Sequence, residues 1–421
     1  MHRNREVTHA ARRRALPLIA SGRYHSAMGL DHQLFAISQL EVNMAVNESP
    51  ETTKRAEKRM SQSYWALVWW RFKRSRAAIG GVIVVFLSYF IGALFAEFFS
   101  PYPVNRQSKY VEARPQWPHF VDQEGHVHLR PFVYGLEEKL DLQLFKRTYA
   151  VDTSRQYPLY FFVRSEPYKW LGLIPMDIHL FGTDPNDPEA HVFVFGTDRL
   201  GRDVFSRIIF GARLSLLLGL IGQALTLIFG ATLGAISGYY GGGVDMVIQR
   251  TTEFLQAFPR EPILMALAAI IPDVWNPMWI YFGLTIILAF VYWGGLCRQV
   301  RGLVLSLRER EFVLAAQSFG ARDRRLLFRH LIPNTMSHII VIATTMVPGM
   351  IQSEAFLGFL GLGLRPPLTS WGVLMNEVSN VRAIRFHPWL LFPVPFILIS
   401  LLGFNMLGDG LRDAMDPYGA R

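Results

Sequence analysis

The chain has 421 residues, of which 51% are hydrophobic and only 18% are charged, and its formal net charge is +10. Soluble proteins usually carry about 25% charged residues, so this composition excludes an ordinary soluble domain and indicates a mixture of membrane and aqueous parts. The basic excess lies beside apolar runs, as in membrane proteins, which argues against nucleic-acid binding. The single Cys297 excludes an intrachain disulfide framework and a zinc cluster of cysteines, and its place at the end of an apolar run predicts a packing role.

Residues 1–60 are assigned to an N-terminal tail. Its first 43 residues show neither helical nor strand periodicity and lack the compact apolar core of a signal peptide. We therefore expect a disordered tail. The alternative is a mis-assigned start, with translation beginning at Met44.

Six apolar segments approach the roughly 20 residues that a helix needs to cross a hydrocarbon layer. Residues 61–100 are expected to form an amphipathic lead-in and the first transmembrane helix. The third segment is interrupted by Glu253, Arg260 and Pro262, which leaves its start open; part of it is either interfacial or kinked. The six segments are Ile79–Phe99, Leu214–Ile236, Val247–Ile271, Met278–Cys297, Ser337–Leu357 and Trp389–Gly408.

The Lys and Arg residues predict the orientation of these segments. Eight lie between Lys54 and Arg76, eight lie between Arg298 and Arg329, and none lies in Pro272–Pro277. Basic loops stay on the cytoplasmic side, so both termini are expected to be cytoplasmic. The predicted fold is an all-α polytopic membrane protein with six transmembrane helices.

Residues 101–195 form an insert that is expected on the extracytoplasmic side of the membrane by the same parity. The apolar runs Leu159–Val163 and His191–Phe195 predict short strands. The tetrapeptide Phe-Gly-Thr-Asp at 181–184 and 195–198 is interpreted as a turn used twice. Five histidines lack the spacing and carboxylates of a metal site, so exposed loop residues are favoured and no metal is predicted; they are His119, His126, His128, His179 and His191.

A helix, a glycine break and a second, basic helix are predicted after the fourth segment. Ala315 and Ala316 are small enough for another surface to approach closely, and Gly320 can adopt the positive φ of a sharp corner. Pro333 lacks an amide donor and disfavours helix at Ile332, which predicts that the second helix ends there. The alternative is an ordinary basic loop between helices.

This stretch resembles the cytoplasmic "EAA" loop of binding-protein-dependent ABC importer permeases. The family pattern is Glu-Ala-Ala, three residues, Gly, nine residues, then Ile-x-Leu-Pro; here Leu314 replaces the Glu and Ile332 replaces the Leu. In that family the loop forms a coupling helix that docks into a groove on the ATPase subunit. The resemblance assigns ATPase coupling to Ala315, Ala316, Gly320, Ala321 and Pro333.

Other runs resemble the second, or "C", permease subunit of the dipeptide, oligopeptide and nickel importers. They include Phe195–Asp203, Gly238–Gly242, Ser353–Gly363 and Asp409–Asp413. The resemblance implies that residues 196–421 are a permease core with five transmembrane helices, in the bacterial inner membrane. It also implies a homologous permease subunit as heterodimer partner, two ABC ATPase subunits that use the ATP, and an extracytoplasmic solute-binding protein. Peptides, nickel complexes and oligosaccharides stay open as the solute.

Ionisable residues near the membrane boundary supply the other candidate positions. Asp198, Arg202, Asp203 and Arg207 precede the second segment and suit a rigid periplasmic cap of ion pairs. Glu354 lies near the outer end of the fifth segment, where an ionisable group is a functional candidate. A structural hydrogen bond is favoured there over direct contact with the solute.

Motifs for catalysis are absent from the sequence. There is no Gly-x4-Gly-Lys-Ser/Thr phosphate loop, no His-Glu-x-x-His and no Gly-x-Ser-x-Gly, so the chain is expected to be non-enzymatic and to bind no cofactor. An intramembrane enzyme would need paired acidic or Ser–Lys groups within the apolar segments, which show only isolated charges. A self-contained secondary transporter would show inverted repeats, and none is evident.

Overall fold

The computed structural model describes residues 64–141, 146–272 and 274–416. The predicted tail of residues 1–60, including Met44, lies outside these ranges. The chain divides into two compact units, Met1–Leu67 and Val68–Arg421, and the second unit contains the long helices and the strands.

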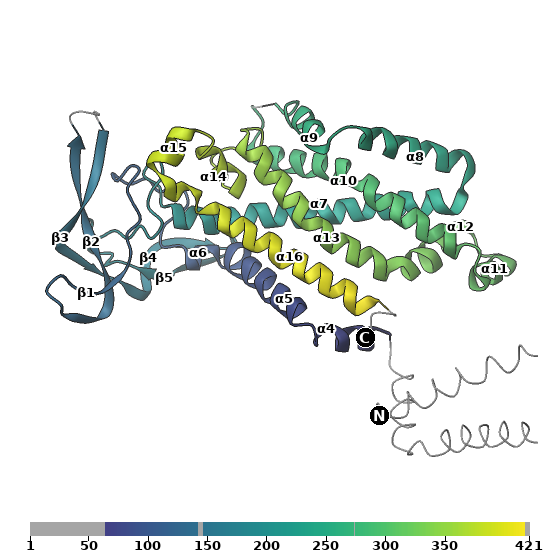
Figure 1. The fold of residues 1–421 in the computed structure, drawn as a ribbon, viewed down its shortest axis with the longest axis horizontal. Coiled ribbons are helices and arrows are strands. Elements are labelled where there is room, and N and C mark those ends of the chain that lie inside the picture. The colour runs from purple at the N-terminus through teal and green to yellow at the C-terminus, as the bar shows by residue number, and fades with distance from the viewer. Residues whose placement is uncertain (1–63, 142–145, 273, 417–421) are drawn as a thin grey trace, which may run out of the picture. The chain divides into compact units, whose positions relative to one another are not determined.

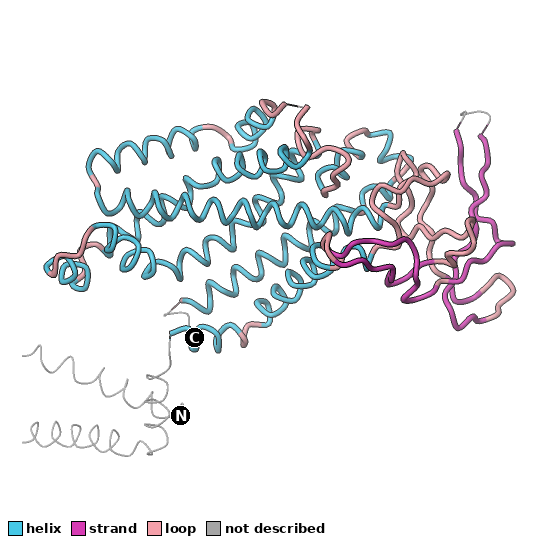
Figure 2. Tube along the Cα trace, turned by 180° about the vertical axis from the view of Figure 1, so that it is seen from behind, coloured by secondary structure: helices cyan, strands magenta, loops and turns pink. Residues whose placement is uncertain are grey.

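Helices make up most of the described chain, and the strands gather at one end of it (Figures 1 and 2). Five of the described helices are long and apolar enough to cross a membrane: Arg76–Leu94, Val204–Tyr240, Pro277–Leu307, Asp323–Phe359 and Pro388–Met415. In chain order the helical elements are α4 (Tyr64–Phe72), α5 (Arg76–Ser88), the π-helix η1 (Tyr89–Leu94), α6 (Ala96–Phe99), α7 (Val204–Tyr240), α8 (Gly242–Ala257), α9 (Arg260–Ala268), α10 (Pro277–Leu307), α11 (Glu311–Ser318), α12 (Asp323–Arg325), the π-helix η2 (Leu326–Leu331), α13 (Ile332–Phe359), α14 (Trp371–Glu377), α15 (Val381–Phe386), the 3-10 helix η3 (Pro388–Leu391) and α16 (Pro393–Met415).

Glycines bring α7 and α10 into close contact. A Cβ built on Gly234 would lie 2.5 Å from the carbonyl oxygen of Cys297, and one on Gly238 would lie 2.8 Å from that of Arg301. Residue numbers rise together along this contact, so α7 and α10 are parallel. Cys297 is buried in it, which agrees with the predicted packing role.

Two parallel neighbours require a return segment between them, and α8 with α9 provides it. Asp245 pairs with Arg301, Arg260 lies 4.2 Å from the ring centroid of Tyr292, and Ile271 packs near Gly283. The return therefore runs antiparallel to α10 along most of its length.

This return segment corresponds to the third predicted span, but it is two helices of 16 and 9 residues. The break falls at Phe258–Pro259, where Phe258 has the extended backbone favoured before proline. Pro262 does not interrupt a helix, because it lies in the first turn of α9, where a missing amide donor costs nothing.

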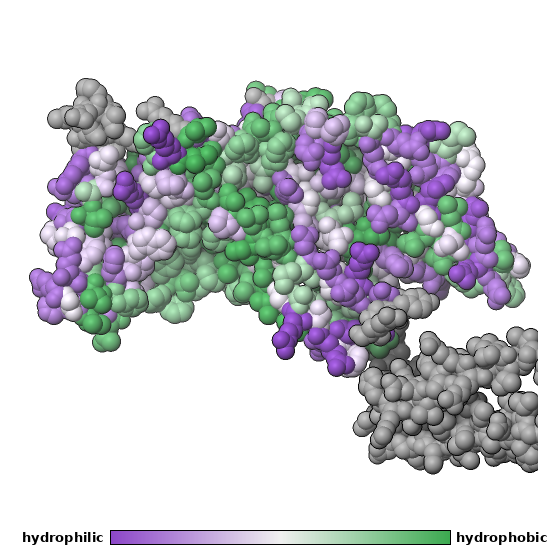
Figure 3. All heavy atoms as spheres, viewed as in Figure 1, coloured by the Kyte–Doolittle hydropathy of each residue, from purple (hydrophilic) through white to green (hydrophobic). Residues whose placement is uncertain are grey.

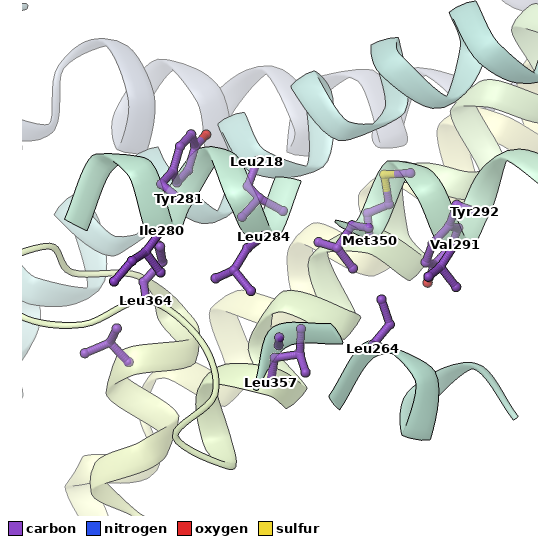
Figure 4. Packing of buried hydrophobic residues seen from close by; sticks show 13 residues of the cluster. Leu218, Leu264, Ile280, Tyr281, Leu284, Val291, Tyr292, Met350, Leu357 and Leu364 are labelled. Carbon is purple, nitrogen blue, oxygen red and sulfur yellow. The ribbon is translucent and has the colours of Figure 1, made fainter. Parts of the chain in front are cut away.

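The remaining long helices pack antiparallel to their neighbours. Ser215 contacts Glu354 and Gly219 contacts Ile351, so α13 is antiparallel to α7. Ala78 contacts Gly410 and Gly81 contacts Gly403, so α16 is antiparallel to α5. Side chains from α7, α9, α10 and α13 share one buried apolar cluster, which includes Leu218, Leu264, Leu284 and Met350 (Figure 4). On the face seen in Figure 3, hydrophobic residues cover the middle of the helices and hydrophilic residues gather towards their ends.

The prediction that a helix ends before Pro333 is wrong. Helix continues from Asp323 to Phe359, and Ile332 has helical φ and ψ of −58° and −46°. The preceding turns are π-helical, and the Ile332 amide donates to the carbonyl of Leu327, five residues back. Such a π-helical turn changes the backbone pairing before the proline, so Pro333 is accommodated at the start of α13.

The insert contains two small antiparallel sheets. One has the order β1 (His119–Val121), β2 (Val127–Asp141) and β3 (Lys146–Pro158), and the other pairs β4 (Tyr160–Trp170) with β5 (Ile174–Gly182). The small strand-containing insert is therefore confirmed, although β2 to β4 are longer than expected.

Three expectations for the insert are wrong. The run His191–Phe195 is a loop, because the amides of Val192 and Phe193 donate to the side chains of Tyr102 and Gln116 instead of to a strand. The repeated tetrapeptide is not one turn used twice: Gly196 has φ +74°, whereas Gly182 ends β5.

The histidines are not uniformly exposed, which is the third difference. The ring of His179 is buried, with its two nitrogens 2.7 Å and 3.0 Å from the backbone oxygens of Ser100 and Glu166. Among the described residues, no group of three or more His, Cys, Asp or Glu side chains is arranged to hold a metal ion.

Gly234→Ala is expected to destabilise the chain by about 1–3 kcal/mol, because its methyl group would collide with the Cys297 carbonyl and force α7 away from α10. Gly302→Ala, on α10 with no atom within 4 Å of the new methyl group, is the control and should be neutral or slightly stabilising. Reaction of buried Cys297 with a thiol-reactive dye during heating in detergent measures both. Equal melting curves for the two variants would contradict the proposed close contact.

Candidate functional site

The α11 segment forms a corner at one end of the helices, which we call the α11 end. The amide of Gly320 donates to the carbonyl of Gln317 at 2.8 Å, and that of Ala321 donates to Ala316 at 3.0 Å. This hydrogen-bond pair is a Schellman motif, which requires a left-handed residue after the helix, and Gly320 has φ +76°.

Buried contacts hold the corner in place. Val313 is fully buried in the same cluster as Val300 and Val304 of α10 and Leu326 of η2. The Tyr239 hydroxyl, at the end of α7, donates to the Asp323 carboxylate at 2.9 Å. The corner is thus anchored to both α7 and α10.

The outward face of the corner is apolar. The side chains of Phe312 and Leu314 are exposed, and Phe319 is 91% exposed at the corner itself. Ala315 is exposed on the same short helix, and Ala316 is half-buried against the core cluster. The sequence-predicted residues 315, 316, 320 and 321 lie together here, whereas Pro333 lies on α13.

At the opposite end, beside the insert, a buried ion-pair cluster joins α7 to α14; we call this the insert end. The Asp198 carboxylate accepts from Arg202 Nε at 2.7 Å and from Arg207 Nη1 at 2.5 Å. Both arginines also donate to Glu377 at the last residue of α14. All four side chains are at most 7% exposed, so the charges are paired away from water.

Asp203 lies beside this cluster but has a different role from the one expected. Its Oδ2 accepts from the Ser206 amide at 2.7 Å and caps the start of α7. Its buried Oδ1 has no hydrogen-bond partner within the described ranges. Burial raises the pKa of Asp203 to about 7.

Glu354 lies at a junction of three helices. Its two carboxylate oxygens accept from Ser215 of α7 at 2.7 Å and from Ser370, the N-cap of α14, at 2.6 Å. The side chain is 1% exposed. This geometry holds α14 against α7 and α13, which supports the structural alternative for Glu354.

Sequence reasoning missed two acidic partners. Glu377 is 170 residues from Arg207, and no local spacing signals their pairing. Glu97, the one charge near the end of the first span, accepts a bidentate pair of hydrogen bonds from Arg213, both at 2.6 Å. An isolated carboxylate within an apolar segment was the available signal, since such a group needs a partner.

Together these features define a polytopic helical membrane protein with an anchored, outward-facing corner helix at one end. Residues 230–418 match the family model of binding-protein-dependent transport system inner membrane components. Residues 63–118 match the N-terminal transmembrane domain of oligopeptide transport permease C.

Curated relatives agree with these matches. The chain is 43% identical over 224 residues to the oligopeptide transport system permease protein OppC of Bacillus subtilis, covering 53% of this chain and 71% of that protein. It is 44% identical over 225 residues to the dipeptide transport system permease protein DppC of Alkalihalophilus pseudofirmus, with the same coverage. It is 42% identical over 229 residues to OppC of Haemophilus influenzae, covering 53% of this chain and 70% of that protein.

The chain belongs to the binding-protein-dependent transport family of inner-membrane permease components. It is therefore a multi-pass membrane subunit of an ABC importer, and a non-catalytic one.

Arg207→Met is expected to destabilise the chain by about 3–5 kcal/mol, because Asp198 and Glu377 would each lose a buried cationic partner. Arg199→Met, at an exposed arginine in the loop just before α7, should change stability by less than about 0.5 kcal/mol. The melting temperature in detergent measures both, and a stable Arg207 variant would show that the cluster does not hold α14.

Asp203 is expected to lower stability as the pH rises from 3.8 towards about 7. Its pKa is higher in the folded chain, which therefore keeps a proton that the unfolded chain has lost within this window; the free energy of unfolding decreases with pH there. Asp203→Asn keeps the cap and removes the titration.

The melting temperature of Asp203→Asn should consequently fall less with pH across this window than that of the unsubstituted chain. Asp409→Asn neutralises an exposed aspartate and serves as the control. Parallel pH profiles for Asp203→Asn and the unsubstituted chain would rule out this titration.

Proposed function

We propose that this chain translocates peptides, as one of two homologous permease subunits that line a shared pathway. The named relatives are oligopeptide and dipeptide permeases, and the chain spans at least 70% of each of them. An extracytoplasmic binding protein delivers the peptide, two ATPase subunits use the ATP, and this chain binds no cofactor.

The corner around α11 is the proposed contact with the ATPase. The supporting observation is that one side of the corner is packed against the core and the other side is exposed: Val313 is fully buried, whereas Phe319 is 91% exposed. A rigid helix with exposed aromatic and aliphatic residues suits the helix-in-groove mode of protein recognition. Exposed arginines on both sides, Arg310, Arg322 and Arg324, favour carboxylates at the rim of that groove.

Coupling follows as a shift between two states. ATP-driven closure of the ATPase dimer moves α11. The ATPase contacts the inward-open and outward-open forms of the permease differently, so its closure changes the balance between these two forms. The residues assigned to this contact are Ala315, Ala316, Gly320 and Ala321; Pro333 supports it from the start of α13.

We also propose that α8 and α9 together make the third of six crossings. They run beside α10 from Asp245, near Arg301, to Ile271, near Gly283. That path is comparable to the other crossings, although neither helix reaches the length of a full span alone.

The distribution of basic residues supports a cytoplasmic α11 end. Lys73, Arg74 and Arg76, at and just before the start of α5, lie at this end, because the first span runs antiparallel to α7. Tyr89 contacts Leu216 and Gly92 contacts Ala212, and α7 ends at the α11 end. The arginines of residues 308–329 lie at the same end. By the positive-inside rule this distribution supports cytoplasmic termini and an extracytoplasmic insert.

The insert is proposed to contact the binding protein or the partner permease. Leu136 of β2 and Tyr149 of β3 pack with Tyr110 against Phe193, in the loop that precedes α7. A folded surface beside α7 suits such a contact. Asp198, Arg202 and Arg207 then form the periplasmic cap that was expected from the sequence, with Asp203 capping α7 beside it.

Phe319→Ser is expected to reduce peptide uptake and peptide-stimulated ATP hydrolysis at least about tenfold, since loss of an exposed aromatic anchor at an interface costs about 2 kcal/mol or more. Val274→Ser is the matched control, because Val274 is also 91% exposed but lies just before α10, at the insert end. Both variants should retain their melting temperature in detergent. Normal uptake by the Phe319 variant would remove α11 as the coupling contact, and uptake without any ATPase would favour a secondary transporter.

A further inference from the structure

The β4–β5 hairpin exposes an unusual amount of apolar surface. The seven residues Trp170–Met176 around its turn carry no charge, and Leu171, Leu173 and Ile174 are exposed, Leu173 by 81%. Within the described part of the chain β4 pairs only with β5. A two-stranded hairpin is marginally stable in water, so another surface must support it.

That surface is the end of the first span, as Figure 1 shows for β4, β5 and α6. At the base of the hairpin, His179 contacts the Ser100 carbonyl, and the rings of Phe162 and Phe98 lie 6.1 Å apart. Nearer the tip, the ring of Trp170 stacks on Phe95 at 5.3 Å. The hairpin therefore runs from its base at Ser100 back along the helix, towards the hydrocarbon layer.

The helix is broken where the tip reaches it. Phe95, between η1 and α6, has φ −120° and ψ 29°, which are not helical. The carbonyl of Leu94 accepts from the Trp170 indole at 2.7 Å, and that of Ala93 accepts from Arg213 at 2.8 Å. Backbone carbonyls near hydrocarbon need protein donors, and the hairpin supplies one of them.

The length of the first span places this contact at the membrane boundary. Arg76–Leu94 has 19 residues, which span about 28 Å at 1.5 Å per residue, close to the thickness of the hydrocarbon layer. Leu94 thus lies at its edge. The span's exposed apolar side chains include Ile83, Phe86 and Leu94. The exposed Leu171, Leu173 and Ile174 follow Trp170, which donates to the Leu94 carbonyl.

We propose that the tip of the β4–β5 hairpin lies in the interfacial layer of the outer leaflet and binds lipid. Trp170 has the amphipathic ring found at such interfaces. Lys169 and Asp177 flank the uncharged turn, and the unpaired strand edges require polar neighbours, so the tip enters no deeper than the headgroup–acyl boundary. The insert is then held to the membrane at a second point besides its chain connections.

The test uses the assembled transporter in liposomes, with Cys297 changed to Ala so that one new cysteine carries an environment-sensitive fluorophore. Leu173→Cys reports on the tip, and Leu129→Cys, on β2 and fully exposed, is the matched control. Lipids carrying a doxyl quencher either near the headgroup or near the chain end report depth, and aqueous iodide reports exposure to water. Peptide-stimulated ATP hydrolysis verifies that both labelled transporters are assembled.

The Leu173 label should emit at shorter wavelength than the Leu129 label, be quenched several-fold less by iodide, and be quenched more by the shallow doxyl lipid than by the deep one. Equal iodide quenching at the two positions would show that the tip lies in water. Short-wavelength emission without doxyl quenching would show that protein, such as the partner permease, covers the tip. Stronger quenching by the deep doxyl lipid would contradict an interfacial position; each of these three outcomes overturns the proposal.

Discussion

The close approach of α7 to its neighbours is the constraint on which the rest of the fold depends. At Gly234 and Gly238 there is no room for a side chain against the backbone of α10. The absence of a side chain at Gly219 likewise leaves space for the side chain of Ile351 of α13. Without a solvent-driven hydrophobic force between helices in lipid, such close packing is a main source of helix association. Because the α7–α10 contact is parallel, it also dictates that the chain return between them, which α8 and α9 accomplish.

Polar contacts secure α7 at both ends. At the insert end, Arg207 and Arg213 reach carboxylates on α14 and α6, and at the α11 end Tyr239 reaches Asp323. Packed cores transmit displacement because they do not deform continuously. A helix that is fixed at each end in this way connects the proposed ATPase contact with the elements around the insert, and Glu354 joins it to α14 through Ser215 and Ser370.

Much of this organisation was predictable from the sequence, because apolar length and glycine spacing are local properties. The long helices and the corner at Gly320 follow from them directly. The pairing of Arg207 with Glu377 was not predictable, since it joins residues far apart in the chain. The continuous helix through Pro333 was missed because proline usually stops a helix, whereas here a π-helical turn accommodates it. The His191–Phe195 loop was missed because side chains of Tyr102 and Gln116 take the hydrogen bonds that a strand would have made.

The π-helical turn at Leu326–Leu331 has a geometric consequence for the direction in which α11 points. A π turn accommodates one more residue than the equivalent α-helical turn, and each residue of an α-helix advances it by about 100°. Removing one residue from this turn would rotate α11 by roughly that angle about the α13 axis, out of register with its contacts on α7 and α10. The single additional residue thus lets the helix continue into α13 while Val313 and Asp323 keep the contacts that fix the direction of Phe319.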